Sequence, residues 1–342
     1  MTEKIARKLI NAVLQNAYTT DSIGFSTGKA GIALTLFESA RFFKDVSIED
    51  HAFDLFQEVL AYDFKDNGFF NGKAGIDFSL QYLIRNQLLN VDDDLFFTQH
   101  QEVIDTIRKV PYNEQGMLRY LDDYFYLETS ALDSPGIRKT RQSVLVSYML
   151  DIFRKIGRET VPKNAGTFYR LSSGMLSMLN SVEHTGKTDL LFDQISEIHE
   201  KMVLADSIID YPLFPLHYYL YELTGNRNTS PDQGKKMIRE CMKNLVYDTF
   251  GFRQRIDMVI SIYRVYSFDR SMDYRDDAGR IIDTITDQET DRLEKKIVPL
   301  IRTNDGLDFS IGSGISRLLL LYIYWDEINR GVFPPHLMEL LH

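Results

Sequence analysis

Few side chains in this sequence have the type and setting for acid–base chemistry. His217, in the segment PLFPLHYYLYEL, opens an apolar helical segment and is the histidine best placed to act as a general base. A histidine among aromatic residues is also often a hydrogen-bonded core residue, so both interpretations of His217 stay open. The other histidines show no metal-ligand spacing, since His199-Glu200 lacks the second histidine of an H-E-x-x-H motif. The histidines therefore predict no metal site.

A cluster of charged residues lies at the start of another apolar segment. It consists of Arg253, Arg255 and Asp257, in the sequence GFRQRID. Two guanidinium groups beside one carboxylate form either a structural ion-pair network or a site that receives an acidic group. Both roles stay open at this stage.

Aspartates supply a second enzymatic alternative. Glycoside hydrolysis needs two carboxylates about 5–10 Å apart, one on each side of the scissile bond. Asp122 and Asp123 in one segment, and Asp305 and Asp308 in another, could converge across a ring of helices. Sugar clefts are usually lined with tryptophan, however, and the one tryptophan, Trp325, lies late in an apolar segment. An α/α-toroid glycosidase is therefore a minor alternative.

The composition limits the cellular compartment and the partners that are expected for this protein. A single cysteine, Cys241, excludes an internal disulfide and fits a reducing compartment. The segment MTEKIARKLINAVLQ lacks the apolar stretch of a signal peptide, and no apolar run has the length of a membrane span, so we expect a cytoplasmic protein. With a formal net charge of −10 and acidic residues spread along the chain, neither nucleic acid nor an anionic membrane is expected as a partner.

A block of nine residues occurs twice and indicates how the elements are arranged. Gly24–Ile32 (GFSTGKAGI) returns as Gly68–Ile76 (GFFNGKAGI), with seven of nine positions identical and a period of 68 − 24 = 44 residues. A fixed period of this size is typical of repeat proteins. Glycine at this spacing directly before a helix permits close approach of one helix end to its neighbours. We therefore interpret these glycines as structural.

The block also resembles a phosphate-binding loop. A Walker A motif has four residues between its first glycine and its Gly-Lys pair, and a Ser or Thr after the lysine. Here three residues separate Gly24 from Gly28, and Ala30 follows Lys29. Nucleotide binding is therefore not expected.

Two kinds of helical segment alternate along the chain. Half-polar segments, with apolar residues on one face, are expected at 3–18, 47–62, 93–109, 137–157, 188–208, 232–248 and 279–302. Each is followed by a segment that is apolar around most of its circumference, as a helix buried on all sides must be. These apolar segments are expected to open near residues 31, 75, 121, 174, 216, 258 and 314.

The alternation predicts an all-α fold. We expect about seven helical hairpins in a double-layered α/α toroid that uses residues 1–342 as a single domain. An open solenoid of the HEAT type is the competing architecture. Open arrays usually end in polar capping units, whereas the last apolar segment, Ile315–Trp325, is as apolar as the others. A closed ring explains that segment better.

Helical hairpins whose apolar helices open in G-x-x-G, after a glycine-containing loop, resemble the lanthionine synthetase C-like (LanC-like) proteins. The resemblance covers essentially the whole chain and is strongest at Gly24–Ile32, at Gly68–Ile76 and at 304–325 (NDGLDFSIGSGISRLLLLYIYW). It implies an α/α toroid and a role in the maturation of ribosomally made peptides. Family cyclases bind zinc through two cysteines and a histidine, and the metal activates a peptide cysteine thiol for addition to a dehydroamino acid.

The chain departs from this family at the metal site. Aligned on Gly314, the positions of the family's Cys-His-Gly hold Phe309, Ser310 and Ile311, and the preceding repeat supplies no cysteine in GFRQRID. Cys241 falls in a half-polar segment, and one misplaced thiol cannot replace the tetrahedral ligand set of zinc. The resemblance therefore implies a zinc-free member, for which we expect no cofactor.

The resemblance also implies which residues lie at the mouth of the toroid. Aligned on Gly174, Arg170 takes the place of a family histidine that transfers protons, and an arginine can bind an oxyanion but cannot shuttle protons near neutrality. We expect a peptide substrate or precursor peptide, with a peptide-modifying enzyme as a further partner. The alternative is a metal-independent cyclase that adds cysteine thiols to dehydroamino acids, with His217 as its base. The residues expected to bind the peptide are Asn71, Arg170, Arg253, Arg255, Asp257, Asp308 and Ser310.

Overall fold

The described residues of the computed structural model are helical, with turns and loops between the helices. They comprise 3–90, 93–108, 117–129, 135–158, 165–179, 182, 184–204, 212–224, 231–296, 309–312 and 314–341. No β-strand occurs within these ranges. The all-α prediction is confirmed. No helix in the same ranges is long and apolar enough to cross a bilayer.

The predicted half-polar segments form helices with one buried face. In α3, Leu55, Phe56 and Val59 are buried, whereas Asp54 and Glu58 are exposed, as the helical period requires. The boundaries of this set are α1 (Glu3–Ala17), α3 (Val46–Leu60), α5 (Asp93–Arg108), α7 (Pro135–Gly157), α9 (Gly186–Leu204), α11 (Asp232–Lys243) and α13 (Arg275–Lys296).

The predicted apolar segments form a second set, which we call the buried helices. Every residue of the last one is buried. They are α2 (Lys29–Phe43), α4 (Lys73–Arg85), α6 (Met117–Thr129), α8 (Ala165–Leu179), α10 (Leu213–Thr224), α12 (Phe252–Phe268) and α14 (Ile315–Ile323). Three short elements were not predicted: η2 (Tyr247–Thr249), α15 (Trp325–Asn329) and α16 (Pro335–Leu340).

Two of the predicted helix starts are wrong. Gly174 lies inside α8, which begins at Ala165, and α12 begins at Phe252 rather than near residue 258. A Cβ atom at Gly174 would lie 3.0 Å from Cδ1 of Leu121 in α6, so this glycine allows a close contact between helices and marks no turn. The alignment that placed Arg170 at the opening of a helix is therefore also wrong, since Arg170 is an exposed residue within α8.

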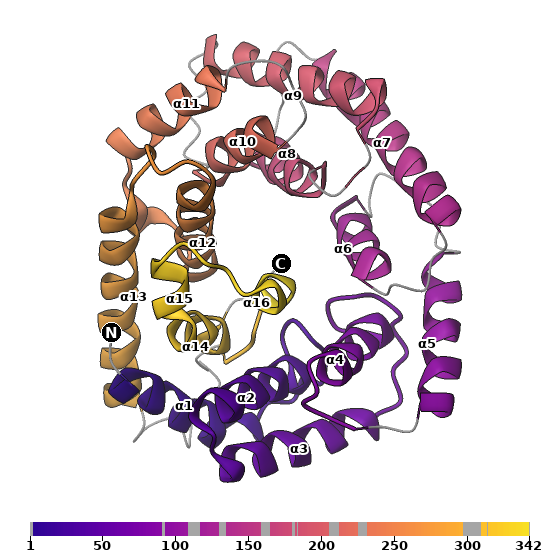
Figure 1. Cartoon of the computed structure of the whole chain (residues 1–342), viewed down its shortest axis with the longest axis vertical. Coiled ribbons are helices and arrows are strands. Elements are labelled where there is room, and N and C mark those ends of the chain that lie inside the picture. Colours follow the sequence, from indigo (N-terminus) through magenta and orange to yellow (C-terminus); the bar gives the residue numbers. More distant parts are fainter. Residues whose placement is uncertain are drawn as a thin grey trace. The chain divides into compact units, whose positions relative to one another are not determined.

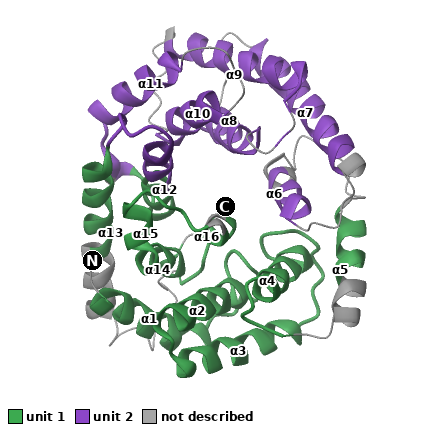
Figure 2. Ribbon diagram, viewed as in Figure 1, with its two compact units in different colours: residues 1–110, 250–259, 274–342 green, residues 111–249, 260–273 purple. Residues whose placement is uncertain are grey.

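The chain divides into two compact units (Figure 2). Unit 1 comprises Met1–Val110, Phe250–Val259 and Tyr274–His342, and unit 2 comprises Pro111–Thr249 and Ile260–Asp273. Within unit 1, α2 packs against α1, α3, α4 and α14 (Figure 1). The first and the last of the buried helices are therefore neighbours, although 286 residues separate their capping glycines, Gly28 and Gly314 (314 − 28 = 286).

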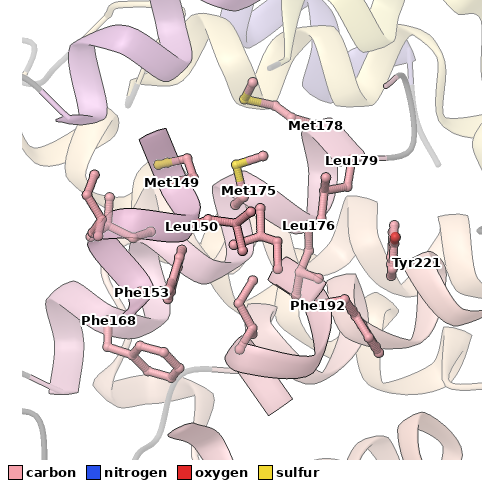
Figure 3. Close-up of a cluster of buried hydrophobic side chains, with 14 of the residues drawn as sticks. Met149, Leu150, Phe153, Phe168, Met175, Leu176, Met178, Leu179, Phe192 and Tyr221 are labelled. Atoms are coloured by element: carbon pink, nitrogen blue, oxygen red, sulfur yellow. The ribbon is translucent and has the colours of Figure 1, made fainter. Parts of the chain in front are cut away.

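Unit 2 has its own hydrophobic core (Figure 3). In it α7 packs against α9, and α8 packs against α6, α9 and α10. Burial of side chains of this size stabilises a fold by about 1.5–3 kcal/mol each. The residues labelled in the figure come from α7, α8, α9 and α10: Met149, Leu150, Phe153, Phe168, Met175, Leu176, Met178, Leu179, Phe192 and Tyr221.

Candidate functional site

The repeated glycine block forms loops that bond to one another before α2, α4 and α14. The Ser26 amide donates to the carbonyl oxygen of Phe70 at 2.7 Å, and the Gly312 amide donates to the carbonyl oxygen of Ser26 at 2.7 Å. Each of these three residues lies two positions before the glycine that caps its helix, namely Gly28, Gly72 or Gly314. The three loops are therefore equivalent, and each bonds to the next through the same backbone position.

A second glycine, one turn into the helix, makes this contact close. A Cβ atom at Gly31 would overlap the side chain of Ile311, from the loop before α14. At Gly75 a Cβ atom would lie 2.9 Å from Cβ of Phe25, which holds the equivalent place in the loop before α2. The structural interpretation of these glycines is confirmed, because only hydrogen fits at each position.

The helix amides behind these loops are already bonded. Lys29 and Ala30 donate their amides to the carbonyl oxygens of Ser22 (3.0 Å) and Ile23 (3.1 Å). Lys73, at the same place in α4, donates to the carbonyl oxygen of Asp66 at 2.9 Å. A phosphate-binding loop leaves such amides for its ligand. The geometry therefore agrees with the sequence, which lacks a complete Walker A motif.

The cap geometry corrects the alignment of the last repeat. Gly314 caps α14 with φ −115° and ψ −164°, and Gly28 caps α2 with φ −135° and ψ −168°. Gly314 therefore corresponds to Gly28 and not to Gly31, a shift of three residues. In this register the two residues before the capping glycine of the last repeat are Gly312 and Ser313, whose side chains are not zinc ligands; Ser313 lies outside the described residues. Across the described ranges, no three His, Cys, Asp or Glu residues are grouped to hold a metal ion.

Two residues predicted to bind the peptide take part in the loop contacts. Asn71 is exposed, and its Oδ1 accepts hydrogen bonds from the Thr27 amide (3.3 Å) and hydroxyl (3.0 Å). Ser310 is buried, and its carbonyl oxygen accepts from the Gly314 amide at 3.1 Å. Asp308, a third such residue, lies outside the described residues.

The charged cluster at the start of α12 is an ion-pair network that includes an unpredicted partner. Arg317, in the first turn of α14, is buried and donates to the Asp257 carboxylate. The same guanidinium donates to the carbonyl oxygen of Leu341 at 2.6 Å. Nε of Arg253 lies 3.5 Å from the Asp257 carboxylate. Burial lowers the pKa of Arg317, and the charge of Asp257 opposes this shift.

The structure also places the other predicted charged residues. Arg255 donates its Nε to the carbonyl oxygen of Phe250 at 2.9 Å. Asp123 is buried in α6, and Asp122 is half-buried beside it. Adjacent helical residues point about 100° apart, so these two carboxylates do not face one another as a catalytic pair. The aspartates proposed to oppose them, at 305 and 308, lie outside the described residues.

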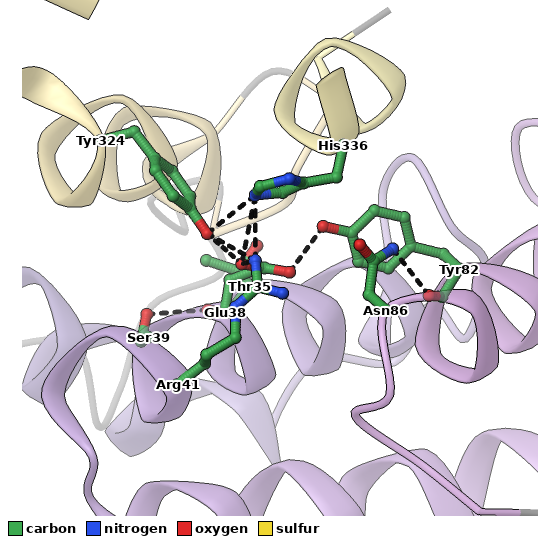
Figure 4. Close-up of polar contacts among 8 residues, drawn as sticks. All are labelled: Thr35, Glu38, Ser39, Arg41, Tyr82, Asn86, Tyr324 and His336. Atoms are coloured by element: carbon green, nitrogen blue, oxygen red, sulfur yellow. Dashed lines mark hydrogen bonds and ion pairs between the residues drawn. The ribbon is translucent and has the colours of Figure 1, made fainter. Parts of the chain in front are cut away.

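At the other ends of the buried helices lies a second polar constellation, which we call the Glu38 cluster (Figure 4). Glu38, in α2, has no exposed surface and accepts hydrogen bonds from the hydroxyl groups of Tyr82 (2.5 Å) and Tyr324. Arg41, one turn later in α2, pairs with the same carboxylate and donates to the Tyr324 hydroxyl at 2.8 Å. His336, in α16, completes the cluster.

The repeat explains why these side chains meet. Glu38, Tyr82 and Tyr324 each lie ten residues after the capping glycine of their helix (38 − 28 = 82 − 72 = 324 − 314 = 10). Neighbouring buried helices in register therefore bring the three side chains side by side. None of the three was among the predicted site residues. The available signal was a glutamate inside the largely apolar segment IALTLFESARFF, with a tyrosine one period of 44 residues later.

Burial and the Glu38 charge set the protonation of the cluster. Burial, followed by the charge of Glu38, raises the pKa of both Tyr82 and Tyr324. Burial alone would lower the pKa of Arg41, but the hydrogen bond to Tyr324 and the charge of Glu38 outweigh it and raise that pKa. At neutral pH the two tyrosines are therefore neutral phenols, and Arg41 is a guanidinium cation.

His336 is a neutral acceptor in this cluster. Its Nε2 lies 2.9 Å from Nη2 of Arg41 and 3.1 Å from the Tyr324 hydroxyl. A guanidinium only donates, so Nε2 accepts and the ring proton resides on Nδ1. Burial lowers the pKa of His336, and the charge of Glu38 offsets only part of this shift.

In unit 2 the predicted base, His217, is half-buried on α10 and has a polar partner. Its Nε2 lies 3.2 Å from Oγ of Ser261, a buried residue of α12. The neighbouring Phe214 and Tyr218 are fully packed. His199 differs, because burial lowers its pKa to about 4 and its Nδ1 lies 2.7 Å from the Tyr169 hydroxyl, as expected of a core histidine.

Comparison with known proteins finds no family model that matches this sequence and no matching curated protein.

Proposed function

We propose that the chain is a zinc-free LanC-like protein, an α/α toroid that binds the precursor of a ribosomally made, post-translationally modified peptide in its central cavity. In this proposal the protein is cytoplasmic and acts beside a peptide-modifying enzyme. Its binding residues at the mouth include Asn71, Arg253, Arg255 and Asp257.

One observation carries this proposal: the loop before α14 bonds to the loop before α2, which bonds to the loop before α4. In an open solenoid the first and last units are far apart, and each contacts only its sequence neighbours. A contact between the first and last buried helices is what a closed ring requires. It supports the toroid, and with it the resemblance that implies peptide maturation.

Binding is favoured over catalysis by the chemistry at the glycine loops. The side chains there form structural hydrogen bonds and ion pairs, and the two residues before the capping glycine of the last repeat are glycine and serine, which are not zinc ligands. Arg253 keeps 42% of its side-chain surface exposed, which suits it to contact acidic groups of a peptide.

A metal-independent cyclase is the second candidate, and the pairing of His217 with Ser261 favours it. In such an enzyme His217 accepts the proton of a peptide cysteine thiol. The sulphur then adds to the β-carbon of a dehydroalanine or dehydrobutyrine, and the α-carbon receives a proton. The product is a thioether of unchanged mass, with one free thiol fewer.

Affinity capture separates these proposals from unrelated toroid functions. Full-length protein is used to capture peptides from cells of its own organism, and the bound peptides are identified by mass spectrometry. We expect a peptide with cysteine residues and with serine or threonine residues that have lost water. Capture of no such peptide, with the native neighbouring proteins present, would count against peptide maturation.

Thiol counting then separates binding from catalysis. The captured peptide, still carrying dehydroamino acids, is incubated with the protein and labelled with N-ethylmaleimide. The binding proposal predicts that every thiol remains reactive. A loss of reactive thiols that is abolished by His217→Asn, with the peptide mass unchanged before labelling, would support the cyclase instead.

A further inference from the structure

The short helix α16 contacts the other helices of unit 1 through polar groups near both of its ends, and it has buried leucines on one face. Leu337, Leu340 and Leu341 are buried, so the apolar side chains recur at the spacing of one helix face. A loop with Gly331 at φ 74° precedes the helix and separates it from α15. α16 is therefore a short amphipathic helix that contacts helices formed earlier in the chain.

Three buried helices supply the cations that receive α16. Arg41 of α2 donates to His336 (2.9 Å), and Arg85 of α4 pairs with Glu339 (2.8 Å). Arg317 of α14 donates to the carbonyl oxygen of Leu341 (2.6 Å). Each of these three polar contacts is therefore made by a guanidinium group, while the leucines of this segment are buried.

Arg317 is buried, but the other two guanidinium groups that contact α16 are partly exposed to solvent. Arg41 keeps 34% of its side-chain surface exposed, and Arg85 keeps 39%. On α16, His336 and Glu339 are also partly exposed, at 24% and 30% of their side chains. A polar, solvent-accessible rim around buried apolar side chains is typical of protein–protein interfaces.

We propose that this surface of α2, α4 and α14 is a docking site for a short amphipathic peptide helix, which the chain's own α16 occupies and which a peptide must displace. The peptide chemistry follows from the present occupant. Like the segment of α16 that it replaces, the peptide carries leucines at the spacing Leu-x-x-Leu-Leu, an acidic residue facing Arg85, and a neutral acceptor facing Arg41. The inference rests on the proposed peptide-binding function and adds that α16 regulates access.

The test uses the full chain and a synthetic peptide. The double variant Leu337→Glu, Leu340→Glu places two charges on the buried face of α16 and is expected to release it. Binding of a fluorescein-labelled peptide with the sequence of residues 333–342 (FPPHLMELLH) is measured by anisotropy. We expect saturable binding to the double variant, at least tenfold tighter than to the wild type.

Two controls define the specificity. The variant Val332→Glu changes an exposed residue just before α16, 58% exposed, and is expected to bind the peptide as weakly as the wild type. The same labelled peptide with glutamate at both leucine positions is expected not to bind the double variant. Equal peptide binding by wild type and double variant, with the double variant folded, would overturn the proposal.

Hydrogen exchange of the wild type keeps the proposal testable if the double variant does not fold. We expect the α16 amides, corrected for intrinsic rates, to exchange at least tenfold faster than those of α14, because a detachable helix opens without the rest of unit 1. Exchange of α16 and α14 at one common rate would overturn the proposal.

The outcomes also separate this inference from the proposed function. If the double variant binds the synthetic peptide but the protein captures no modified precursor, the docking surface stands and peptide maturation fails. If a precursor is captured equally well by wild type and double variant, peptide binding stands and regulation by α16 fails.

Discussion

Glu38 is a buried carboxylate whose charge is stabilised by three donors, two phenols and one guanidinium. Such a group is tolerated only when its hydrogen-bonding capacity is filled, because an unpaired buried charge costs several kcal/mol. Removing it leaves the donors of Tyr82, Tyr324 and Arg41 without their common acceptor. The cluster therefore couples α2, α4 and α14 through one side chain.

We predict that Glu38→Ala destabilises unit 1 by roughly 3 kcal/mol, within the range for breaking a buried charged contact. Glu3→Ala is the matched control, because Glu3 pairs with Arg7 on the surface with 67% of its side chain exposed, and it should change nothing measurable. The measurement is the free energy of urea unfolding of each variant. Equal stability of the two variants would show that the cluster does not hold the helices together.

The glycine at position 31 gives a second prediction. Gly31→Ala should lower the free energy of unfolding by about 2 kcal/mol or more, because its Cβ atom would overlap Ile311. Gly279→Ala, inside α13 with no heavy atom within 4 Å of the added Cβ, should raise that free energy by up to about 1 kcal/mol. The two substitutions are chemically identical, so opposite signs in urea unfolding isolate the effect of close packing. A gain in stability at both positions would contradict the close contact between Gly31 and the loop before α14.

The residues of the candidate site were only partly predictable. The structural role of Gly28 and Gly31 followed from the repeat, because a repeated glycine block needs a repeated contact. Tyr324 could not be found in the same way, since Ser310 stands in the last repeat where Gly24 stands in the first, and the alignment slipped by three residues. Without the cap geometry of Gly314, no sequence argument placed Tyr324 beside Glu38.

At the scale of elements, helix existence was predictable and helix starts were less so. The boundaries of the half-polar helices were predicted to within a few residues. Each of these helices has one side that faces solvent, so its polar and apolar residues recur with the helical period. The start of α8 was missed because a glycine that serves a helix contact, Gly174, looks like a turn in the sequence. The six residues of α16 are too few for a helical period to be recognised.

The docking of α16 should depend on pH through His336. The groups that face this imidazole are Arg41 and Glu38 from α2, Tyr324 after α14, and Glu327 of α15 at longer range. Docking lowers the pKa of His336, so the released helix binds more protons, and docking weakens as pH falls below the ordinary histidine value of about 6.5.

We therefore expect the α16 amides to lose protection between pH 7 and pH 5, after correction for intrinsic exchange. His336→Gln keeps an acceptor for Arg41 and removes the titration, so its protection should be independent of pH in this range. A wild-type protein with equal α16 protection at both pH values would contradict the neutral state assigned to His336.

The lowered pKa of His199 leads to a similar prediction for the helices of unit 2. Its pKa of about 4 in the fold lies below the value of about 6.5 in an unfolded chain, so the unfolded state binds more protons between these values. The stability that neutral His199 contributes is fully present above pH 6.5 and is lost as the pH falls toward 4. We expect a loss of roughly 2 kcal/mol at pH 4.5, allowing for partial solvent exposure.

Urea unfolding of wild type and His199→Gln at pH 7 and pH 4.5 tests this expectation. The variant should lose about 2 kcal/mol less than the wild type on acidification, because the glutamine does not titrate. Identical losses in the two proteins would show that His199 is not held neutral in the core.

At the scale of the whole molecule, the decisive feature is that the last repeat packs on the first. In an open repeat array the loss of a terminal unit leaves the remaining units folded. Here α14 is a packing partner of α1 and α2, with Leu318, Leu319 and Leu320 fully buried. We predict that removing residues 275–342 abolishes protection of the α2 and α4 amides in hydrogen exchange, whereas an open solenoid would retain it.

The burial of α14 could be anticipated from its apolar character, but the partners of that helix could not. The largely apolar sequence of α14 indicates only that this helix is covered on all sides. Which helix covers it is set by contacts between residues almost 300 positions apart, such as Gly312 with Ser26, for which the sequence holds no local signal.

The most direct test of the proposed function is native mass spectrometry of the full-length protein purified from its own organism. The binding proposal predicts a complex whose added mass is that of a modified ribosomal peptide, released intact on denaturation, with no zinc in the assembly. Stoichiometric zinc, or a protein that never carries a peptide under conditions where the modified precursor is present, would contradict it.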